Sequence, residues 1–474
     1  MIRPNTQVFP RSTTSRCRKR KKKSLGGLSS RTAIIGAIER VRAVAFAAAR
    51  FSMKGDSMTE MISLEEAQAL VLANVAPLST EVVEVLDAVG RVSAADLASD
   101  IDIAPFAHSA MDGFAVHAAE LESASEDEPV ELDVIAEIGA GEVYDGPIEA
   151  GQCVRIMTGA PVPDAADAVV KYEIVGVVSG DGKPGSRVSF TAPTKLRNNI
   201  REAGEEAHAG EVIVHTGEVI TSAGVGFLAG CGVLQVPVYR RPKVAIAATG
   251  SELIDPSEVP SAGKIRNSNS LAIAACAKAA GCIPTILPIV EDTYEALEKT
   301  VLDAVETYDF VVTTGGAANG DFDFIKPVVE GTGELLMTTV NMRPGKAQTF
   351  GLVKGKPVFG LPGNPAAAYC GFEMIVRQAL RKMQGYSHFN RPVVRARLSQ
   401  DTKKKDPRRI FLRATLTKDD EGYLVTPAQN QSSGLFGPIQ RSNCMAIMPE
   451  GLESRAAGSM IDCVLLDVSE EVLI

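Results

Sequence analysis

The run Phe310-Val311-Val312-Thr313-Thr314-Gly315-Gly316 sets the fold class of this chain. Its apolar and β-branched residues favour a buried strand, and the paired glycines that follow are typical of a tight turn at the strand end. Around this run, patterns typical of strands and helices alternate from 243 to 383. Such alternation predicts right-handed crossovers, and therefore a doubly wound, mostly parallel sheet with helices on both faces.

The elements of this α/β domain are predicted from apolar runs and helix signals. Ligands of such sheets bind beyond the carboxyl ends of the strands, so the loops after the strands are where a site is expected. Strands are expected at 243–248, 283–290, 310–313 and 357–361, and helices at 269–280, 294–306 and 365–383.

The sequence predicts a multidomain α/β protein with further parts on either side of this sheet. Residues 1–57 carry 14 Lys and Arg against two acidic residues. We expect them to be a disordered leader, or the product of a start site assigned too early, with the real start at Met53 or Met58. The expected parts are 58–240, a helical region with a β-rich segment inserted at about 98–197; 241–385, the α/β domain; and 386–474, a small C-terminal β domain.

Local signals predict elements in these parts as well. Ser63-Leu64-Glu65-Glu66 is a capping box that opens a helix to about residue 75. A second helix is expected at 79–89, closed by Gly90, and a third at 221–228. Alternating runs predict strands at 130–138, 187–191, 393–398, 411–416 and 463–468.

The composition excludes several classes of function. The formal net charge is −9 even with the basic leader, so the rest of the chain is acidic, which argues against a general nucleic-acid binder. No apolar run reaches 18 residues, so no membrane-spanning segment is expected. The eight cysteines form no C-x-x-C pair and the five histidines no ligand spacing, which favours reduced thiols in the cytoplasm over a zinc or iron–sulfur site.

The loop at 314–323 carries the clearest ligand chemistry. Gly315 and Gly316 let backbone N–H groups approach an anion closely. Asp321 and Asp323 could hold a divalent cation against a phosphate. A tight strand-to-helix turn, with an aspartate near the helix start, is the alternative interpretation.

Four other loops end at the same edge of the expected sheet. Leu361-Pro362-Gly363-Asn364-Pro365 places an N-capping Asn and a proline at a helix start, and predicts unpaired N–H groups there. Asn341-Met342-Arg343-Pro344-Gly345-Lys346 adds two cations on a Pro-Gly turn. Thr249-Gly250-Ser251-Glu252 and Glu291-Asp292 supply carboxylates. Together these loops predict a phosphorylated ligand bound with a metal.

The β-rich segment contains two loops, 105–114 and 155–163, with polar tips between apolar flanks. This pattern predicts ordered loops held at a surface. Asp112 is a candidate site residue, but with Gly113 after it, it could equally be a turn former.

Seven segments in order along the chain resemble the molybdopterin molybdenumtransferase family, the bacterial MoeA proteins and the E domain of gephyrin. The resemblance extends from about residue 62 to 474, so only the basic leader lies outside it. The segments are Ser109-Ala110-Met111-Asp112-Gly113-Phe114-Ala115, Met157-Thr158-Gly159-Ala160-Pro161-Val162-Pro163, Asn199-Ile200-Arg201-Glu202-Ala203-Gly204-Glu205, Thr249-Gly250-Ser251-Glu252-Leu253, Thr314-Gly315-Gly316, Pro344-Gly345-Lys346 and Leu361-Pro362-Gly363-Asn364-Pro365.

The resemblance implies an α/β domain of the molybdopterin-binding type and a transferase reaction. Members of the family insert molybdate into adenylylated molybdopterin in a Mg²⁺-dependent step, and release AMP and the molybdenum cofactor. The resemblance also implies a homodimer, in which the β-rich segment of one subunit faces the α/β domain of the other, and molybdopterin adenylyltransferase as a further contact. Asp112 and Thr158 would then reach a ligand held mainly by the partner chain.

The resemblance also assigns roles residue by residue. The implied catalytic residues are Asp112, Thr158, Glu252, Asp292 and Asp323. The implied metal and molybdate ligands are Glu252, Asp292, Asp321 and Asp323. The implied substrate contacts are Thr314, Gly315, Gly316, Arg343, Pro344, Gly345, Lys346, Pro362, Gly363, Asn364 and Ser433, the last within Gln431-Ser432-Ser433-Gly434.

The chain departs from the family pattern at several positions near the implied anion, and these leave open whether molybdate or tungstate is used. Two other functions stay as alternatives: molybdopterin adenylyltransferase, since those enzymes share the α/β domain, and a non-catalytic dimeric scaffold of the gephyrin kind. The β-rich segment favours insertion over adenylylation, and the retained acids favour an enzyme over a scaffold. The positions that depart from the family pattern are Thr339 and Arg343, where many members have Lys, together with Ser251, Ala318 and Ala107-His108.

Overall fold

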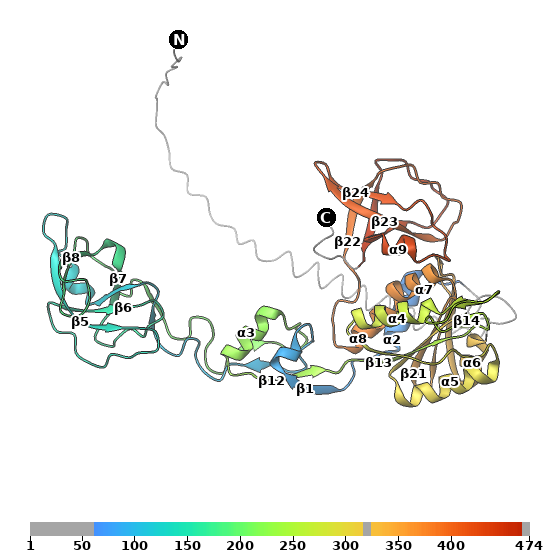
Figure 1. Cartoon of the computed structure of the whole chain (residues 1–474), viewed down its shortest axis with the longest axis horizontal. Coiled ribbons are helices and arrows are strands. Elements are labelled where there is room, and N and C mark those ends of the chain that lie inside the picture. Colours follow the sequence, from blue (N-terminus) through green and yellow to red (C-terminus); the bar gives the residue numbers. More distant parts are fainter. Residues whose placement is uncertain (1–60, 316–323, 467–474) are drawn as a thin grey trace, which may run out of the picture. The chain divides into compact units, whose positions relative to one another are not determined.

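The computed structural model describes residues 61–315 and 324–466. The predicted leader lies outside these ranges, and so do the predicted site residues Gly316, Asp321 and Asp323. Within them, three six-stranded sheets and four two-stranded sheets organise the chain (Figure 1). No helix in the described ranges has the length and apolar character that crossing a membrane requires.

The sheet of the α/β domain confirms the prediction of a mostly parallel arrangement. Its order is β16-β13-β17-β21-β20-β18, and the first four strands run parallel to one another. The pairings of β20 with β21 and with β18 are antiparallel, a feature that the alternation of strands and helices did not predict. Bounds are Lys243–Ala248 for β13, Ile283–Ile286 for β16, Phe310–Thr314 for β17, Gly333–Thr339 for β18, Ala347–Val353 for β20 and Lys356–Leu361 for β21.

The strands of this sheet are buried on both faces, and their side chains alternate between two cores. Val244 and Ile246 of β13 join one core, and Ala245 and Ala247 join the other. Helices α4, α7 and α8 cover the first face, and α5 and α6 the second. These helices are Ser268–Ala279 (α4), Tyr294–Thr307 (α5), Ile325–Thr332 (α6), Pro365–Gly371 (α7) and Arg377–Met383 (α8), with a π-helical turn, η4, at Phe372–Val376.

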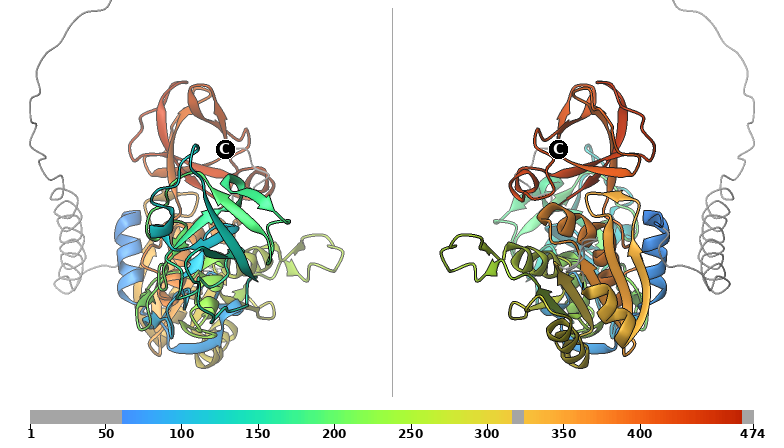
Figure 2. Two further views of the ribbon diagram at one scale, coloured as in Figure 1. Left: turned by 90° about the vertical axis from the view of Figure 1, so that its left-hand side faces the viewer. Right: turned by 90° about the vertical axis from the view of Figure 1, so that its right-hand side faces the viewer.

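The N-terminal helix α2 (Leu64–Ala73) belongs to the same core. The predicted capping box is present, because Ser63 accepts the Glu66 N–H and the Glu66 side chain accepts the Ser63 N–H. Leu64, Ala67 and Val71 are buried in the first core. Both views of Figure 2 show this helix, in blue, beside the orange elements of the α/β domain.

An arm (residues 80–98 and 212–239) connects the α/β domain to the β-rich segment. The predicted helix at 79–89 is wrong. Thr80–Glu84 is a strand, β1, which pairs antiparallel with β12 (Gln235–Tyr239) and is followed by a short 3-10 turn, η1 (Val85–Ala88). A β-branched strand with a distant partner overrides the local helix signal here. The other arm elements are β2 (Leu97–Ala98), β11 (Val212–Val214) and α3 (Ser222–Gly230).

The inserted segment forms a β module (residues 113–190) with a sheet of order β7-β4-β6-β5-β9-β8. The predicted strand at 130–138 is confirmed, and that at 187–191 is confirmed to within one residue. Strands are β4 (Gly113–Val116), β5 (Val130–Ile138), β6 (Gln152–Ile156), β7 (Ala168–Lys171), β8 (Gly176–Ser179) and β9 (Arg187–Phe190), with 3-10 turns η2 (Ala118–Leu121) and η3 (Tyr172–Ile174); β3 (His108–Ser109) and β10 (Ile200–Arg201) pair beside it.

The C-terminal β domain is a small closed barrel. Its strands follow the order β19-β23-β24-β22-β26-β25, and a further pairing of β23 with β25 closes the sheet. One strand, β19 (Met342–Arg343), comes from the loop between β18 and β20. The others are β22 (Val393–Leu398), β23 (Arg409–Asp419), β24 (Gly422–Pro427), β25 (Cys444–Met448) and β26 (Met460–Leu465), with the short helix α9 (Gly437–Gln440); β14 (Leu253–Ile254) and β15 (Ile265–Arg266) form a separate pair in the α/β domain.

An ion pair between the half-buried Arg240, directly after the arm, and the buried Asp309 links the arm to the α/β domain. Both terminal nitrogens of Arg240 donate to the Asp309 carboxylate at 2.6 Å, and the Lys243 N–H donates to it at 2.9 Å. Burial alone would raise the pKa of Asp309, but these hydrogen bonds and the charges of Arg240 and Lys356 outweigh it, so its pKa is lowered.

We therefore expect Asp309→Asn to lower the free energy of unfolding at pH 7 by about 2 kcal/mol, since it removes a charged hydrogen-bond acceptor. A carboxylate with a lowered pKa stabilises above its unfolded pKa of about 4, and this stabilisation is lost as pH falls through the folded pKa. In urea unfolding, the difference in free energy of unfolding between the wild type and Asp309→Asn should thus narrow from pH 7 to pH 3. Asp303→Asn, which breaks only an exposed ion pair with Lys299, is the control, and a difference that does not change with pH would contradict the role of this charge.

Candidate functional site

The carboxyl ends of four parallel strands meet at one edge of the α/β sheet. The Thr249 N–H, after β13, donates to the Thr314 C=O at the end of β17, at 2.9 Å. The Val290 N–H, in the loop after β16, donates to Ala248 C=O at 2.9 Å. The strand β16 ends at Ile286, earlier than the predicted strand at 283–290, and the alternate spacing of donors is broken beyond Leu287, whose N–H still donates to Ile246 C=O. Three of the predicted loops are therefore held side by side.

The loop at Gly315 packs against Thr249 more closely than a side chain would allow. Gly315 has φ +92°, and a Cβ there would lie 2.2 Å from the Thr249 carbonyl oxygen. A Cβ on Gly363, after β21, would lie 3.5 Å from the Gly315 Cα. Only glycine is compatible with this backbone at 315, and the result is a patch of bare main chain at the centre of the edge.

Two carboxylates lie beside this patch. A Cβ on Gly250 would come within 2.6 Å of Glu252 Oε2, so the Glu252 carboxylate folds back over its own loop. Burial, reinforced by the negative charge of Glu252, raises the pKa of Asp292. The loops after β13 and β16 therefore present two like charges at short range.

Such a pair suits a divalent cation, because oxygen ligands with charge are what Mg²⁺ prefers and a cation would relieve the repulsion. In the ranges 61–315 and 324–466, however, no three His, Cys, Asp or Glu side chains gather closely enough to hold a metal. The other two predicted ligands, Asp321 and Asp323, lie outside the described residues. Glu252 and Asp292 are thus two of the four predicted metal ligands, and the described residues alone do not complete a metal site.

The start of α7 differs from the prediction. Asn364 occupies the N-cap position, but its side chain makes no capping hydrogen bond. Instead, the Ala366 N–H donates to the C=O of Ser433, from the C-terminal β domain, at 2.8 Å. The N–H groups of Ala367 and Ala368 donate to Asn364 C=O. The first turn is thus capped by main chain, and the predicted unpaired N–H groups at 366–368 are not free. Ser433 does lie at this edge.

The loop between β18 and β20 reaches the same edge through an antiparallel hairpin. Thr349 of β20 pairs with Gly360 of β21, so the start of β20 lies beside the carboxyl end of β21. The Arg343–Pro344 peptide is cis, and Gly345 lies against Ala367 of α7. The predicted Pro-Gly-Lys turn is therefore placed next to the glycine loops.

The two predicted phosphate-side cations of this loop differ in their environment. Arg343 forms an ion pair with Asp406 of the C-terminal β domain at 3.1 Å. The Lys346 side chain is exposed and has no hydrogen bond or ion pair to any residue that the structure describes. Lys346 is thus available to an anion, whereas part of the Arg343 charge is already compensated.

Several residues at this edge were not predicted from the sequence. Thr249 Oγ1, Thr313 Oγ1, Asn269 Oδ1 and Gln348 Oε1 are all buried and lack a hydrogen-bond partner among the described residues. Asn269 belongs to α4, and its Nδ2 donates to Gly363 C=O at 2.8 Å. Buried polar atoms in native proteins are nearly always satisfied, so this concentration supports a polar ligand. For the two threonines, their polar type at the end of strand β13 or β17 was the only available sequence signal.

Arg413 of β23 was also missed. Its side chain is buried, and burial lowers the pKa of its guanidinium. It donates to Ser432 C=O at 3.2 Å, and its Nε has no partner among the described residues. A buried cation beside Ser433 adds positive charge near the start of α7. Its position inside an alternating strand gave no signal of this.

Asp112 and Thr158 contact each other in loops beside the β module. Asp112 Oδ1 accepts both the N–H and the hydroxyl of Thr158 at 2.7 Å. These hydrogen bonds lower the pKa of Asp112. Within the described part of the chain, neither side chain hydrogen bonds to a residue of the α/β domain. The chain therefore joins these two predicted residues, but in its described part gives them no hydrogen bond to the sheet edge.

Comparisons with known proteins cover nearly all of the described chain. Family models match for the MoeA N-terminal region (domain I and II) at 62–232, the probable molybdopterin binding domain at 245–382 and the MoeA C-terminal region (domain IV) at 395–466. A molybdopterin molybdenumtransferase of Staphylococcus aureus (strain COL) is 36% identical over 387 residues, covering 81% of this chain and 91% of its own. One of Staphylococcus epidermidis is 35% identical over 416 residues, covering 87% and 98%. The crystal structure of a molybdopterin biosynthesis MoeA protein from Pyrococcus horikosii matches with TM-score 0.73 and 30% identity, over 86% of this chain and 99% of its own.

The Asp112–Thr158 contact predicts that Asp112→Ala will loosen the loop without unfolding the module, because both residues are exposed at its surface. Hydrogen exchange of the Thr158 amide should rise about tenfold. Asp112→Asn keeps an acceptor oxygen, so the Thr158 amide should keep most of its protection against hydrogen exchange. Equal exchange in the alanine variant and the wild type would show that the contact does not order the loop.

Proposed function

The chain belongs to the molybdopterin molybdenumtransferase (MoeA) family of molybdenum cofactor biosynthesis, and we propose that it inserts molybdate into adenylylated molybdopterin. The reaction would need Mg²⁺ and release AMP together with the molybdenum cofactor. The observation that carries this proposal is the meeting of four loops at one sheet edge, where bare glycine backbone lies beside two carboxylates.

The residues at this edge suit a positioning role more than covalent catalysis. Glu252 and Asp292 would hold Mg²⁺, with Asp321 and Asp323 as the remaining proposed ligands. When bound, the cation would offset negative charge on the phosphate of the substrate. Lys346 lies at the same edge with a free ammonium group and would bind phosphate as a point charge.

The glycine backbone and the orphan polar groups would orient the rest of the substrate. Gly315 and Gly363 carry no side chains, so the substrate would contact main-chain groups of their loops. The unpaired oxygens of Thr249, Thr313 and Asn269 would give its polar groups partners. Such preorganised contacts stabilise developing charge without the cost of rearranging solvent.

We further propose a cytoplasmic homodimer with composite sites. Asp112 and Thr158 order a loop of their own and make no bond to the sheet edge of the same chain in the described residues. A partner subunit could bring the same two residues to the edge, as the family resemblance implies. Molybdopterin adenylyltransferase, which would supply the adenylylated substrate, is the proposed further partner.

The proposed reaction is tested by incubating purified protein with adenylylated molybdopterin, Mg²⁺ and molybdate, and following AMP release. Tungstate in parallel reactions tests the choice of oxyanion. Asp292→Asn should fold normally, because it changes one half-buried loop carboxylate, but should slow AMP release at least about tenfold, or roughly 1.4 kcal/mol of barrier. High Mg²⁺ should rescue part of this loss. Asp303→Asn, on the exposed face of α5, is the control, and undiminished AMP release by Asp292→Asn at subsaturating Mg²⁺ would remove this residue from the site.

The composite site is tested by mixing Asp112→Ala and Asp292→Ala subunits. One of the two sites in each mixed dimer would then retain both residues, so we expect part of the AMP release to return. Each variant alone is the control, and native mass spectrometry checks that mixed dimers form. No recovery in demonstrated mixed dimers would show that Asp112 and Asp292 serve the same chain.

A further inference from the structure

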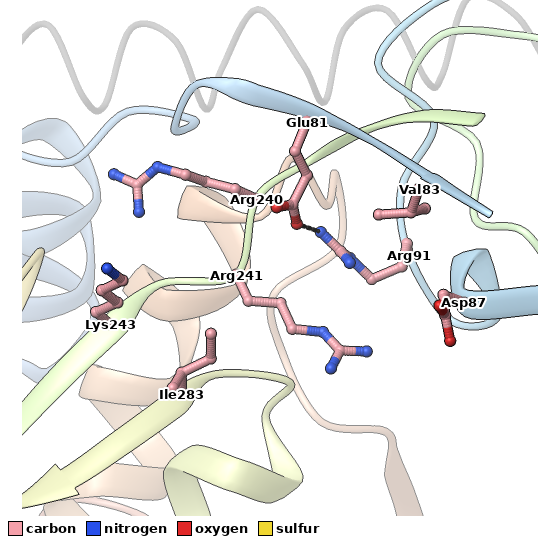
Figure 3. A pocket seen from close by; sticks show the side chains of 8 residues that line it. All are labelled: Glu81, Val83, Asp87, Arg91, Arg240, Arg241, Lys243 and Ile283. Carbon is pink, nitrogen blue, oxygen red and sulfur yellow. Dashed lines mark hydrogen bonds and ion pairs between the residues drawn. The ribbon is translucent and has the colours of Figure 1, made fainter. Parts of the chain in front are cut away.

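Two adjoining cavities lie at the opposite edge of the sheet, away from the site described above. The first, of about 350 Å³, is lined by Lys243 and Ile283 at the starts of β13 and β16, together with residues of the arm (Figure 3). The second, of about 230 Å³, is lined by the end of α4 and by Arg381 of α8. Arg91 and Arg241 line both cavities. The two cavities therefore share one wall of arginines, where the arm joins the α/β domain.

The cations of this wall are only partly compensated. Arg91 is buried; one of its terminal nitrogens donates to Glu81 at 2.5 Å and to Tyr239 C=O at 2.7 Å. Arg240 is held by Asp309. The Arg241 side chain has no hydrogen bond or ion pair to any described residue. In Figure 3 it extends to the same side of the cavity as Arg91, whereas Arg240 extends to the opposite side.

Arg381 adds a second uncompensated guanidinium. It stacks on the ring of Tyr386, with 3.7 Å between its Cζ and the ring centroid, and donates to His388 C=O. No carboxylate in the described ranges pairs with it. Burial lowers the pKa of this group, which shows that part of its hydration has been lost. A half-buried guanidinium without an acid favours an anion from outside the chain.

The acidic groups on these cavities are too few to neutralise the wall. Glu81 already pairs with Arg91. Asp87 is the other acid that lines the first cavity, and none lines the second. In a chain with a net charge of −9, this local excess of guanidinium groups is a specific feature rather than a property of the whole surface.

We propose that Arg91, Arg241 and Arg381 bind a small phosphate-bearing anion at this junction, separate from the reaction site. Guanidinium groups offer forked donors that match phosphate oxygens, and the two cavities have room for a phosphate ion or the phosphate end of a nucleotide. Because Arg91 belongs to the arm and Arg381 to the α/β domain, the bound anion would link the two parts. The bound anion would thus fix the orientation of the arm, and with it the β module, relative to the α/β domain.

Isothermal titration calorimetry of the full chain tests this site, with inorganic phosphate and AMP as probes and chloride to hold the ionic strength constant. Arg241→Gln removes a charge that makes no bond in the described protein, so its melting temperature should not change. Arg441→Gln removes a comparably exposed arginine of the C-terminal β domain that has no side-chain bond in the described ranges. Lys346→Gln reports on phosphate bound at the other edge of the sheet.

We expect Arg241→Gln to weaken phosphate binding at least about tenfold, and Arg441→Gln and Lys346→Gln to leave that binding event unchanged. Similar affinities for phosphate and AMP would identify the phosphate group as the part of the ligand that is bound. Tighter binding of AMP would show that the site also contacts the nucleoside. Both results support the site. Binding that survives Arg241→Gln and is lost in Lys346→Gln would place the anion at the reaction site only. No saturable binding of either probe in the millimolar range would also overturn the proposal.

Discussion

The site depends on the parallel register of β13, β16, β17 and β21, which brings four strand ends to a single edge. The hydrogen bond from Thr249 N–H to Thr314 C=O fixes two of these ends against each other. Gly315 fits at this contact only because it lacks a Cβ. Side chains far apart in sequence, such as Glu252 and Asp292, meet because the strands that carry them are neighbours in this order.

The sheet and most of its helices could be predicted because their signals are local. An apolar run bounded by Gly or Pro indicates a buried strand by itself, as it did for β13 and β17, and a capping box marks the start of α2. The predicted helix at 79–89 failed because β1 is stabilised by β12, about 150 residues later, and no local pattern reports such a partner. The strands β18 and β20 were missed although their partners are close in sequence, since β20 and β21 are joined by the two-residue turn Lys354-Gly355.

The site was predictable as a set of loops but not as a set of contacts. Ser433 C=O caps α7 and Asp406 pairs with Arg343, and both come from the C-terminal β domain, so no spacing within the loops could indicate them. Arg413 and Asn269 are polar residues inside regular elements, where an ordinary structural role is the usual expectation. Their significance comes from burial without full hydrogen bonding, which only the folded chain reveals.

The central claim is that the carboxyl edge of the α/β sheet binds the substrate. Hydrogen exchange with and without adenylylated molybdopterin, at constant Mg²⁺, tests it most directly, since bound ligand slows local opening of the backbone it contacts. The account predicts protection at 249–252, 290–292, 314–315 and 361–366, with strands β22, β24 and β26 of the C-terminal β domain unchanged. Protection confined to the arm or to the starts of β13 and β16, with none in those four loops, would contradict it.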